Sequence, residues 1–171
     1  MNNKRSGEPY SKVEYLAGYQ ILGGVAGLVL MGVLFFKTES ITVPIFLLIL
    51  IPVLLYGYSL FCGILIFRNE YLGLKHSLIN QCLQVVGFSV FGYAFDFVAG
   101  IALRLNLDFT AGFNLGFSMA ISSWQIHILD DIGVRLISLN IISLLLIIFI
   151  IKQRKKTKEA GLKNEVESFY E

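Results

Sequence analysis

Two long runs without a charged side chain constrain this sequence more than any other feature. Residues 16–36 form a run of 21 and residues 44–67 a run of 24, and a helix needs roughly 20 apolar residues to cross the hydrocarbon core of a bilayer. The turn between them is short and polar, and Pro44 suits a first helical turn, where its missing N–H costs nothing. The sequence therefore predicts a transmembrane helical hairpin that follows a polar N-terminal tail over residues 1–15.

Small residues recur at a spacing of four within both runs. Gly23 and Gly27 form such a pair in the first run, and Ser59 and Gly63 form one in the second. On a helix this spacing places both members on one face, which lets two helices approach closely. The general tolerance of membrane helices for glycine explains the same pattern. These four residues are the candidates for helix packing.

The pattern changes to a period of two after residue 90. Between residues 91 and 109, large apolar side chains occupy the odd positions and small or polar ones the even positions, which is the periodicity of a strand. The alternation resumes over 113–121, slips by one residue at 122–123 as a β-bulge would, and ends before a turn predicted at 130–133. We expect an antiparallel meander of about three long strands, with Gly100 marking a bend in the first.

One face of this meander carries large apolar side chains, and something must cover them from water. Phe95, Leu103, Phe117 and Trp124 are the candidate residues of that face. An amphipathic helix within residues 72–87, the membrane surface and a second copy of the chain are the alternatives for covering it. Residues 68–133 are thus expected to form a linker helix and a β-rich region.

The C-terminal part combines an apolar segment with a basic one. Residues 134–151 predict a further membrane segment, and residues 152–171 a charged tail that opens with a basic run over 152–158. A basic run beside a membrane segment usually marks the cytoplasmic side and favours contact with anionic lipid. No nucleic-acid recognition motif accompanies it, so nucleic acid is not an expected partner.

The number of crossings stays open. Residues 82–103 are apolar enough for a helical span, and four spans would place eleven Lys and Arg residues inside against three outside, which the positive-inside rule favours. Three spans would divide them seven against seven. In the four-span arrangement, however, Asp96 would lie deep in a helical span at high cost. The predicted fold is therefore a membrane α+β protein with an N-terminal helical hairpin, a β-meander and a C-terminal apolar helix, and the alternative is a four-helix transmembrane bundle.

The sequence contains little that indicates a catalytic site. His127 precedes Asp130 by three residues, but no nucleophile, zinc pattern or phosphate-binding loop accompanies them. We predict no catalytic, cofactor or metal site. The first hypothesis is a non-catalytic membrane protein that acts through contacts with a second copy or another membrane protein. The alternatives are a sensor that binds lipid or another apolar ligand, and a membrane enzyme that gathers His127, Asp130 and Asp131 in one pocket.

Several short stretches also suggest a family. Residues 23–27, 55–59, 74–81 and 122–126 resemble a group of small uncharacterised multi-span membrane proteins of Bacteroidota-type bacteria. The resemblance covers most of residues 16–152. It implies a multi-pass protein of a bacterial inner membrane, and it brings no activity, cofactor or site residue with it.

Overall fold

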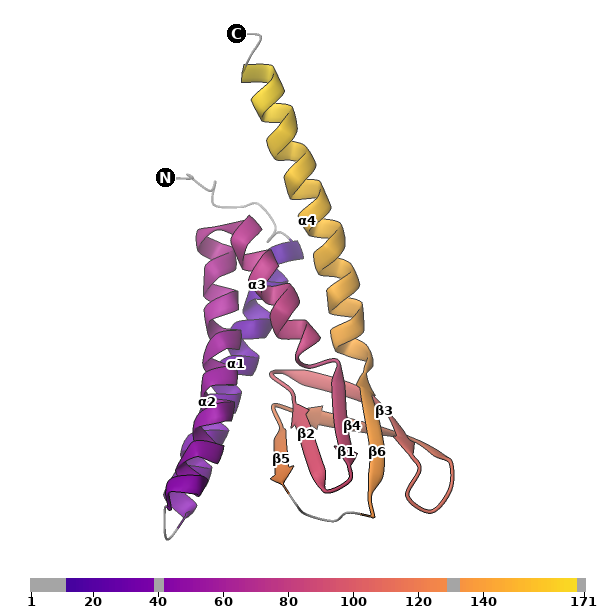
Figure 1. Cartoon of the computed structure of the whole chain (residues 1–171). Helices are drawn as coiled ribbons and strands as arrows, with labels where there is room; N and C mark the ends of the chain where they lie inside the picture. The colour runs from indigo at the N-terminus through magenta and orange to yellow at the C-terminus, as the bar shows by residue number, and fades with distance from the viewer. Residues whose placement is uncertain (1–11, 39–41, 129–132, 169–171) are drawn as a thin grey trace.

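The computed structural model describes residues 12–38, 42–128 and 133–168, and these fold into helices and one sheet (Figure 1). The helices are α1 (Lys12–Lys37), α2 (Val43–Arg68), α3 (Glu70–Cys82) and α4 (Ile141–Ser168). The strands are β1 (Val86–Val90), β2 (Tyr93–Phe97), β3 (Ile101–Asp108), β4 (Asn114–Ile121), β5 (Trp124–Ile128) and β6 (Arg135–Asn140).

The first two helices form the predicted hairpin. Both α1 and α2 are long and apolar enough to cross a membrane, as judged by length and composition. Pro44 lies in the first turn of α2, and the Asn69 side chain caps α3 by accepting a hydrogen bond of 3.0 Å from the Leu72 N–H. The prediction of two apolar helices joined by a short turn is confirmed.

The β-rich region is extended chain, but its topology is not a meander. The six strands pair antiparallel in the order β4-β3-β6-β1-β2-β5. Strand β6 arrives from the C-terminal side and inserts between β1 and β3, so β2 and β3 follow each other in the chain without being neighbours in the sheet. The four-helix bundle is therefore wrong for residues 93–108, and so is the simple meander.

Two backbone positions divide the predicted long strands. Gly100 adopts a φ of +107° between β2 and β3, and a side chain there would meet the Tyr19 hydroxyl oxygen at 2.7 Å, so glycine is required. Ser122 has a φ of 37° between β4 and β5. The backbone pairing continues through this point, because the Ser122 N–H donates to the Gly100 carbonyl at 2.7 Å and the Val98 N–H donates to the Ser123 carbonyl at 2.8 Å. The irregularity therefore lies where it was predicted, although β4 and β5 are separate strands at opposite edges of the sheet.

The segments that flank the sheet also differ from expectation. Residues 135–140 are strand β6 and only then does α4 begin, continuing through the basic run to Ser168. Helix α3 does not cover the apolar sheet face. Its buried Leu74 joins Val13 and Ile66 in a cluster between the helices, which Ile150 of α4 completes. Strand β1 begins within the last two residues of the range 72–87, in which we had expected a helix.

The sheet is curled with its polar side inward. Even-numbered residues such as Ala94 and Ala102 are buried, whereas Phe117, Met119 and Ile121 are 68%, 76% and 74% exposed. We had expected the large apolar side chains to be covered and the polar ones to face water. The observed arrangement is the reverse, except where β2 and β5 pack against the hairpin through Phe97 and Trp124.

Helices α3 and α4 and the sheet lie beside different halves of the hairpin that α1 and α2 form. Helices α3 and α4 lie beside the half of the hairpin that holds its two open ends, and the sheet lies beside the half that holds its turn (Figure 1). The chain passes from α3 into β1 and from β6 into α4. At this junction the Asn140 N–H donates to the Val85 carbonyl at 2.8 Å. The β1–β2 loop points to the end of the molecule where α2 begins, and the β3–β4 loop projects away from the helices (Figure 1).

Close packing inside the hairpin predicts a specific glycine requirement. A Cβ atom at Gly27 would overlap the Tyr56 ring, whereas a Cβ at Gly32 would meet no atom within 4 Å. We expect Gly27→Ala to lower the free energy of unfolding by about 1–3 kcal/mol through overpacking. Gly32→Ala, the matched control, should leave it unchanged or raise it slightly. Reversible unfolding in mixed detergent micelles measures both, and equal values for the two variants would contradict the packing.

Candidate functional site

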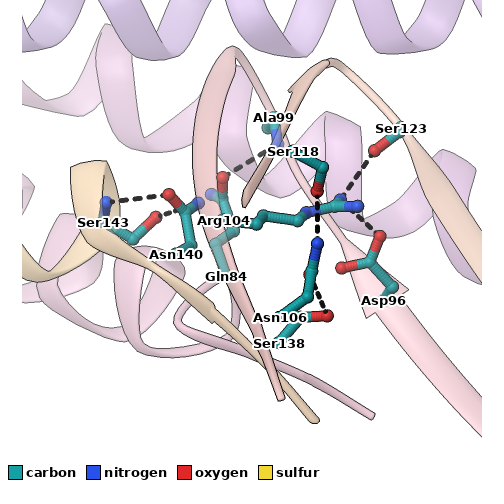
Figure 2. A network of polar contacts seen from close by, with 10 residues as sticks. All are labelled: Gln84, Asp96, Ala99, Arg104, Asn106, Ser118, Ser123, Ser138, Asn140 and Ser143. Atoms are coloured by element: carbon teal, nitrogen blue, oxygen red, sulfur yellow. Dashed lines mark hydrogen bonds and ion pairs between the residues drawn. The ribbon is translucent and has the colours of Figure 1, made fainter. Parts of the chain in front are cut away.

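The polar side of the curled sheet encloses a small chamber. All six strands contribute to its walls, and its volume is about 200 Å³. The residues around it are mainly polar: Gly87, Phe88, Ser89, Asp96, Arg104, Asn106, Ser118, Gln125, Leu136 and Ser138. Figure 2 shows the polar contacts among several of them. At about 30 Å³ for each water, the chamber has room for a few ordered waters or one small polar molecule.

An ion pair crosses the chamber. The Arg104 guanidinium on β3 donates to the Asp96 carboxylate on β2 and to the Ser123 hydroxyl at 2.9 Å (Figure 2). These strands are three positions apart in the sheet, a separation of about 14 Å if the sheet were flat. One arginine side chain cannot span that distance, so the contact exists because the sheet curls. Gly87 leaves room for the carboxylate, since a Cβ there would lie 2.7 Å from Asp96 Oδ1.

A second set of hydrogen bonds links strands β4, β3 and β6, which form the other half of the sheet. Asn106 on β3 donates to the Ser118 hydroxyl on β4 at 2.8 Å and accepts from the Ser138 hydroxyl on β6 at 2.8 Å. Asn140, at the end of β6, donates to the Ser143 hydroxyl at 2.8 Å and accepts from the Ile142 N–H at 3.2 Å. The residue that ends the strand therefore also caps the helix that follows it.

Polar side chains continue from the chamber into the helical half. Gln84 accepts from the Ala99 N–H at 2.8 Å and donates to the Asn80 carbonyl at 3.2 Å. Asn80 in turn donates to the Ser59 hydroxyl at 3.2 Å, and the Ser77 hydroxyl donates to Gln20 Oε1 at 2.9 Å. Such contacts hold apolar helices together in fixed orientation.

The buried amides of the helical half are not all satisfied. Gln20 Nε2, Asn80 Oδ1 and both amide atoms of Gln81 have no hydrogen-bond partner among the described residues. Buried amides of this kind usually bind ordered water.

The chemistry of the chamber is that of a closed polar core. Its two charges neutralise each other, and its amides and hydroxyls are largely engaged with one another. Within residues 12–38, 42–128 and 133–168, no group of three His, Cys, Asp or Glu residues is placed to hold a metal ion. The proposed grouping of His127 with Asp130 and Asp131 lies outside the side chains that the structure describes. The arrangement fixes the curl of the sheet and offers a small polar cavity.

The four candidate packing residues lie at close contacts of the hairpin or the sheet. Ser59 on α2 donates to the Gln20 carbonyl on α1 at 3.2 Å, and a Cβ at Gly63 would lie 2.7 Å from the Ala17 carbonyl oxygen. Gly27 lies under the Tyr56 ring. Gly23 instead faces the sheet, because a Cβ there would lie 2.5 Å from the Gly100 nitrogen.

The four candidate sheet-face residues fall into two groups. Phe95 and Trp124 are partly buried and pack against the cluster that contains Met31 and Phe97, between the sheet and the hairpin. Leu103 is half-buried, and Phe117 is 68% exposed on the outer face of β4. The structure therefore does not bring these four residues together into one apolar binding surface.

The residues of the chamber were not identified as a site from the sequence. Asp96, Arg104, Asn106 and Ser118 share the polar parity of the alternating segments, and that parity was interpreted as the solvent side. The available signal was a pair of opposite charges at even positions in an otherwise uncharged stretch. A search for such pairs would have found Asp96 and Arg104.

Comparisons with known proteins supply no further assignment. No protein-family model, curated protein or solved structure matches this chain.

The ion pair makes a prediction about stability. Asp96→Ala and Arg104→Ala each leave one charge unpaired in the chamber, so each should lower the free energy of unfolding by up to about 3 kcal/mol. The double variant should recover part of this loss, because no isolated charge remains. A double-mutant cycle on the unfolding equilibrium measures the coupling.

The exposed Lys155–Glu159 pair, with an N···O distance of 3.9 Å, is the matched control and should couple by less than about 0.5 kcal/mol. Additive losses for Asp96 and Arg104 would contradict an ion pair that holds the curl.

Proposed function

We propose that this chain is a non-catalytic integral membrane protein that acts through protein contacts of its β-rich region, and that the curled sheet lies in the bilayer beside the helices. The observation that carries the proposal is the inverted polarity of the sheet. Large apolar side chains face outward around a polar interior, as they do in barrels that reside in membranes.

The outer face of the sheet supports this placement. Several of its apolar side chains are at least about 40% exposed: Phe88, Ile101, Leu115, Phe117, Met119 and Ile121. The charged residues Asp96 and Arg104 point into the chamber, and Asp108 and Arg135 lie at the loop end. Hydrogen bonds from Thr110 hold the pKa of Asp108 below its ordinary value, and charged side chains at this end suit a water interface. An apolar surface of this extent on a water-soluble monomer would cause aggregation.

The lengths of the elements support the same placement. Helices α1 and α2 have 26 residues each, which corresponds to about 39 Å. The 13 residues of α3 and the five of β1 together reach about 36 Å, as do β6 and the apolar start of α4 over 141–151. The chain would then pass the bilayer four times, with two passes that change from helix to strand on the way.

The charges support an orientation. The Thr157 hydroxyl on α4 donates to Glu70 at the start of α3 at 2.9 Å. The basic run therefore lies at the end of the molecule where α2 ends at Arg68. An even number of passes brings both termini to this side, and the resulting count of Lys and Arg residues favours the cytoplasm. A bacterial inner membrane, which the resemblance implies, stays a prediction.

Strand β4 is the proposed contact surface. It is an edge strand of eight residues with neither a charge nor a proline. It therefore lacks the features that usually prevent edge strands from pairing. No hydrogen bond joins its outer edge to another described part of the chain. Hydrocarbon cannot satisfy these backbone groups, whereas a second copy that pairs β4 with β4 in antiparallel orientation can.

The alternative function, the binding of lipid or another apolar ligand by the sheet, has less support. An apolar ligand site would require the aromatic face to be hollow or enclosed, but the enclosed side of the sheet is polar. The exposed apolar side chains form a convex outer face that suits acyl chains and a neighbouring strand.

Membrane placement predicts an alternating accessibility along β4. Spin labels at single cysteines, in a background with Cys62 and Cys82 replaced by serine, should report contact with lipid at Phe117 and Met119 and little contact at Ser118. Collision with oxygen, which partitions into lipid, and with a water-soluble nickel chelate measures this in vesicles. A label at Phe117 that meets the nickel chelate more often than oxygen would contradict the placement.

Pairing of β4 predicts a specific cross-linking profile. In the same cysteine-free background, cysteines placed one at a time at Leu115, Phe117 and Met119 should form disulfide-linked dimers in membranes. The yield should peak near one position and fall on both sides, because a two-fold axis passes through the strand pair. Leu22→Cys on α1, which is 72% exposed, is the matched control. Equal yields at Leu22 and along β4 would contradict the strand contact.

A further inference from the structure

A groove runs between α1 and α4 at the end of the molecule where the cations gather. It consists of two adjoining cavities of about 290 and 470 Å³, and Lys12 and Phe149 line both of them. The smaller cavity is almost entirely apolar and the larger one is basic. The groove thus changes from apolar to basic along the helix axes.

The apolar half is formed by one stripe from each helix. Tyr15, Leu16 and Tyr19 contribute from α1, and their spacing of three or four places them on one side of the helix. Ile142, Leu146 and Phe149 contribute from α4 with the same spacing. The stripe of α4 extends over about two helical turns, or 11 Å, and the stripe of α1 over about one turn, or 6 Å.

The basic half follows directly on both helices. Lys152, Lys155 and Lys156 come from the next turns of α4, and Lys12 comes from the start of α1. Glu159 is the one acidic residue of the lining, and its carboxylate lies 3.9 Å from the Lys155 ammonium. Four lysines against one glutamate leave this half strongly positive.

We infer that the groove binds one anionic phospholipid, with its phosphate among Lys12, Lys152 and Lys156 and one acyl chain between the two apolar stripes. The inference rests on the proposed membrane location. A phospholipid has the same order of chemistry as the groove, a charged head followed by hydrocarbon. A free phosphate ion would use only the basic half, and a zwitterionic headgroup would not match its net positive charge.

The test is native mass spectrometry of the full chain in mild detergent, with phosphatidylglycerol or phosphatidylcholine of identical acyl chains. We expect one phosphatidylglycerol to be retained and phosphatidylcholine to be lost. The triple variant Lys12→Gln, Lys152→Gln, Lys156→Gln should lower the bound fraction by about tenfold or more. The control triple Lys37→Gln, Lys75→Gln, Lys158→Gln removes the same charge outside the groove and should bind as the parent does.

Three results would overturn the inference: equal retention of both lipids, unchanged binding by the first triple variant, or displacement of the lipid by excess glycerophosphate, which would identify a site for free phosphate. The spin label at Phe117 separates this failure from that of the membrane placement. If the label still contacts lipid while the lysine variants keep the phospholipid, only the lipid site is lost. If the label contacts water, the membrane placement itself fails.

Discussion

The ion pair of Arg104 and Asp96 is the interaction on which the rest of this structure depends. It joins two strands that would be too far apart in a flat sheet, and so it requires the curl that places polar side chains inside. Two charges removed from water are tolerated only when they are paired and further hydrogen-bonded, and Ser123 supplies the additional contact. Once the polar parity is inside, the opposite parity must face outward, and an apolar outer surface follows.

The curled sheet is joined to the helices by the same kind of contact. Gln84 and Asn140 lie where helix and strand meet. Gln84 accepts from the Ala99 N–H between β2 and β3, and Asn140 accepts from the Ile142 N–H in the first turn of α4. From there, Asn80, Ser77 and Gln20 carry polar contacts into the helical half. One polar interior therefore runs through both halves, and apolar side chains surround it. This arrangement suits a bilayer, where a shared apolar exterior is solvated by lipid.

The two proposed contact surfaces follow from different parts of this arrangement. Strand β4 is available because the sheet curls without closing, so this uncharged edge remains open among the exposed apolar side chains, whereas Trp124 of the other edge strand, β5, packs against the hairpin. The groove is available because α4 continues past its apolar start, residues 141–151, as a basic helix beside the start of α1. One surface offers backbone hydrogen bonds to protein and the other offers charge to a lipid headgroup. A small membrane protein with few polar groups can thus bind two partners of different chemistry.

The sequence by itself determined the local conformation wherever one pattern persisted over many residues. The uncharged runs at 16–36 and 44–67 identified the hairpin, and the period of two identified extended chain between 91 and 128, because these periodicities depend only on helix and strand geometry. Strands β1 and β6 were missed because each has only five or six residues inside a longer apolar stretch, which is too short for a periodicity to show.

Only the tertiary structure decided which face of the sheet is inside. Alternation separates the side chains of a strand into two faces but does not show which face is exposed to solvent. We interpreted the polar face as the exposed one because we assumed that water surrounds the sheet. The contact of Arg104 with Asp96 and the insertion of β6 between β1 and β3 join residues far apart in the chain. No local pattern records such contacts, because they form only when distant segments have already been brought together.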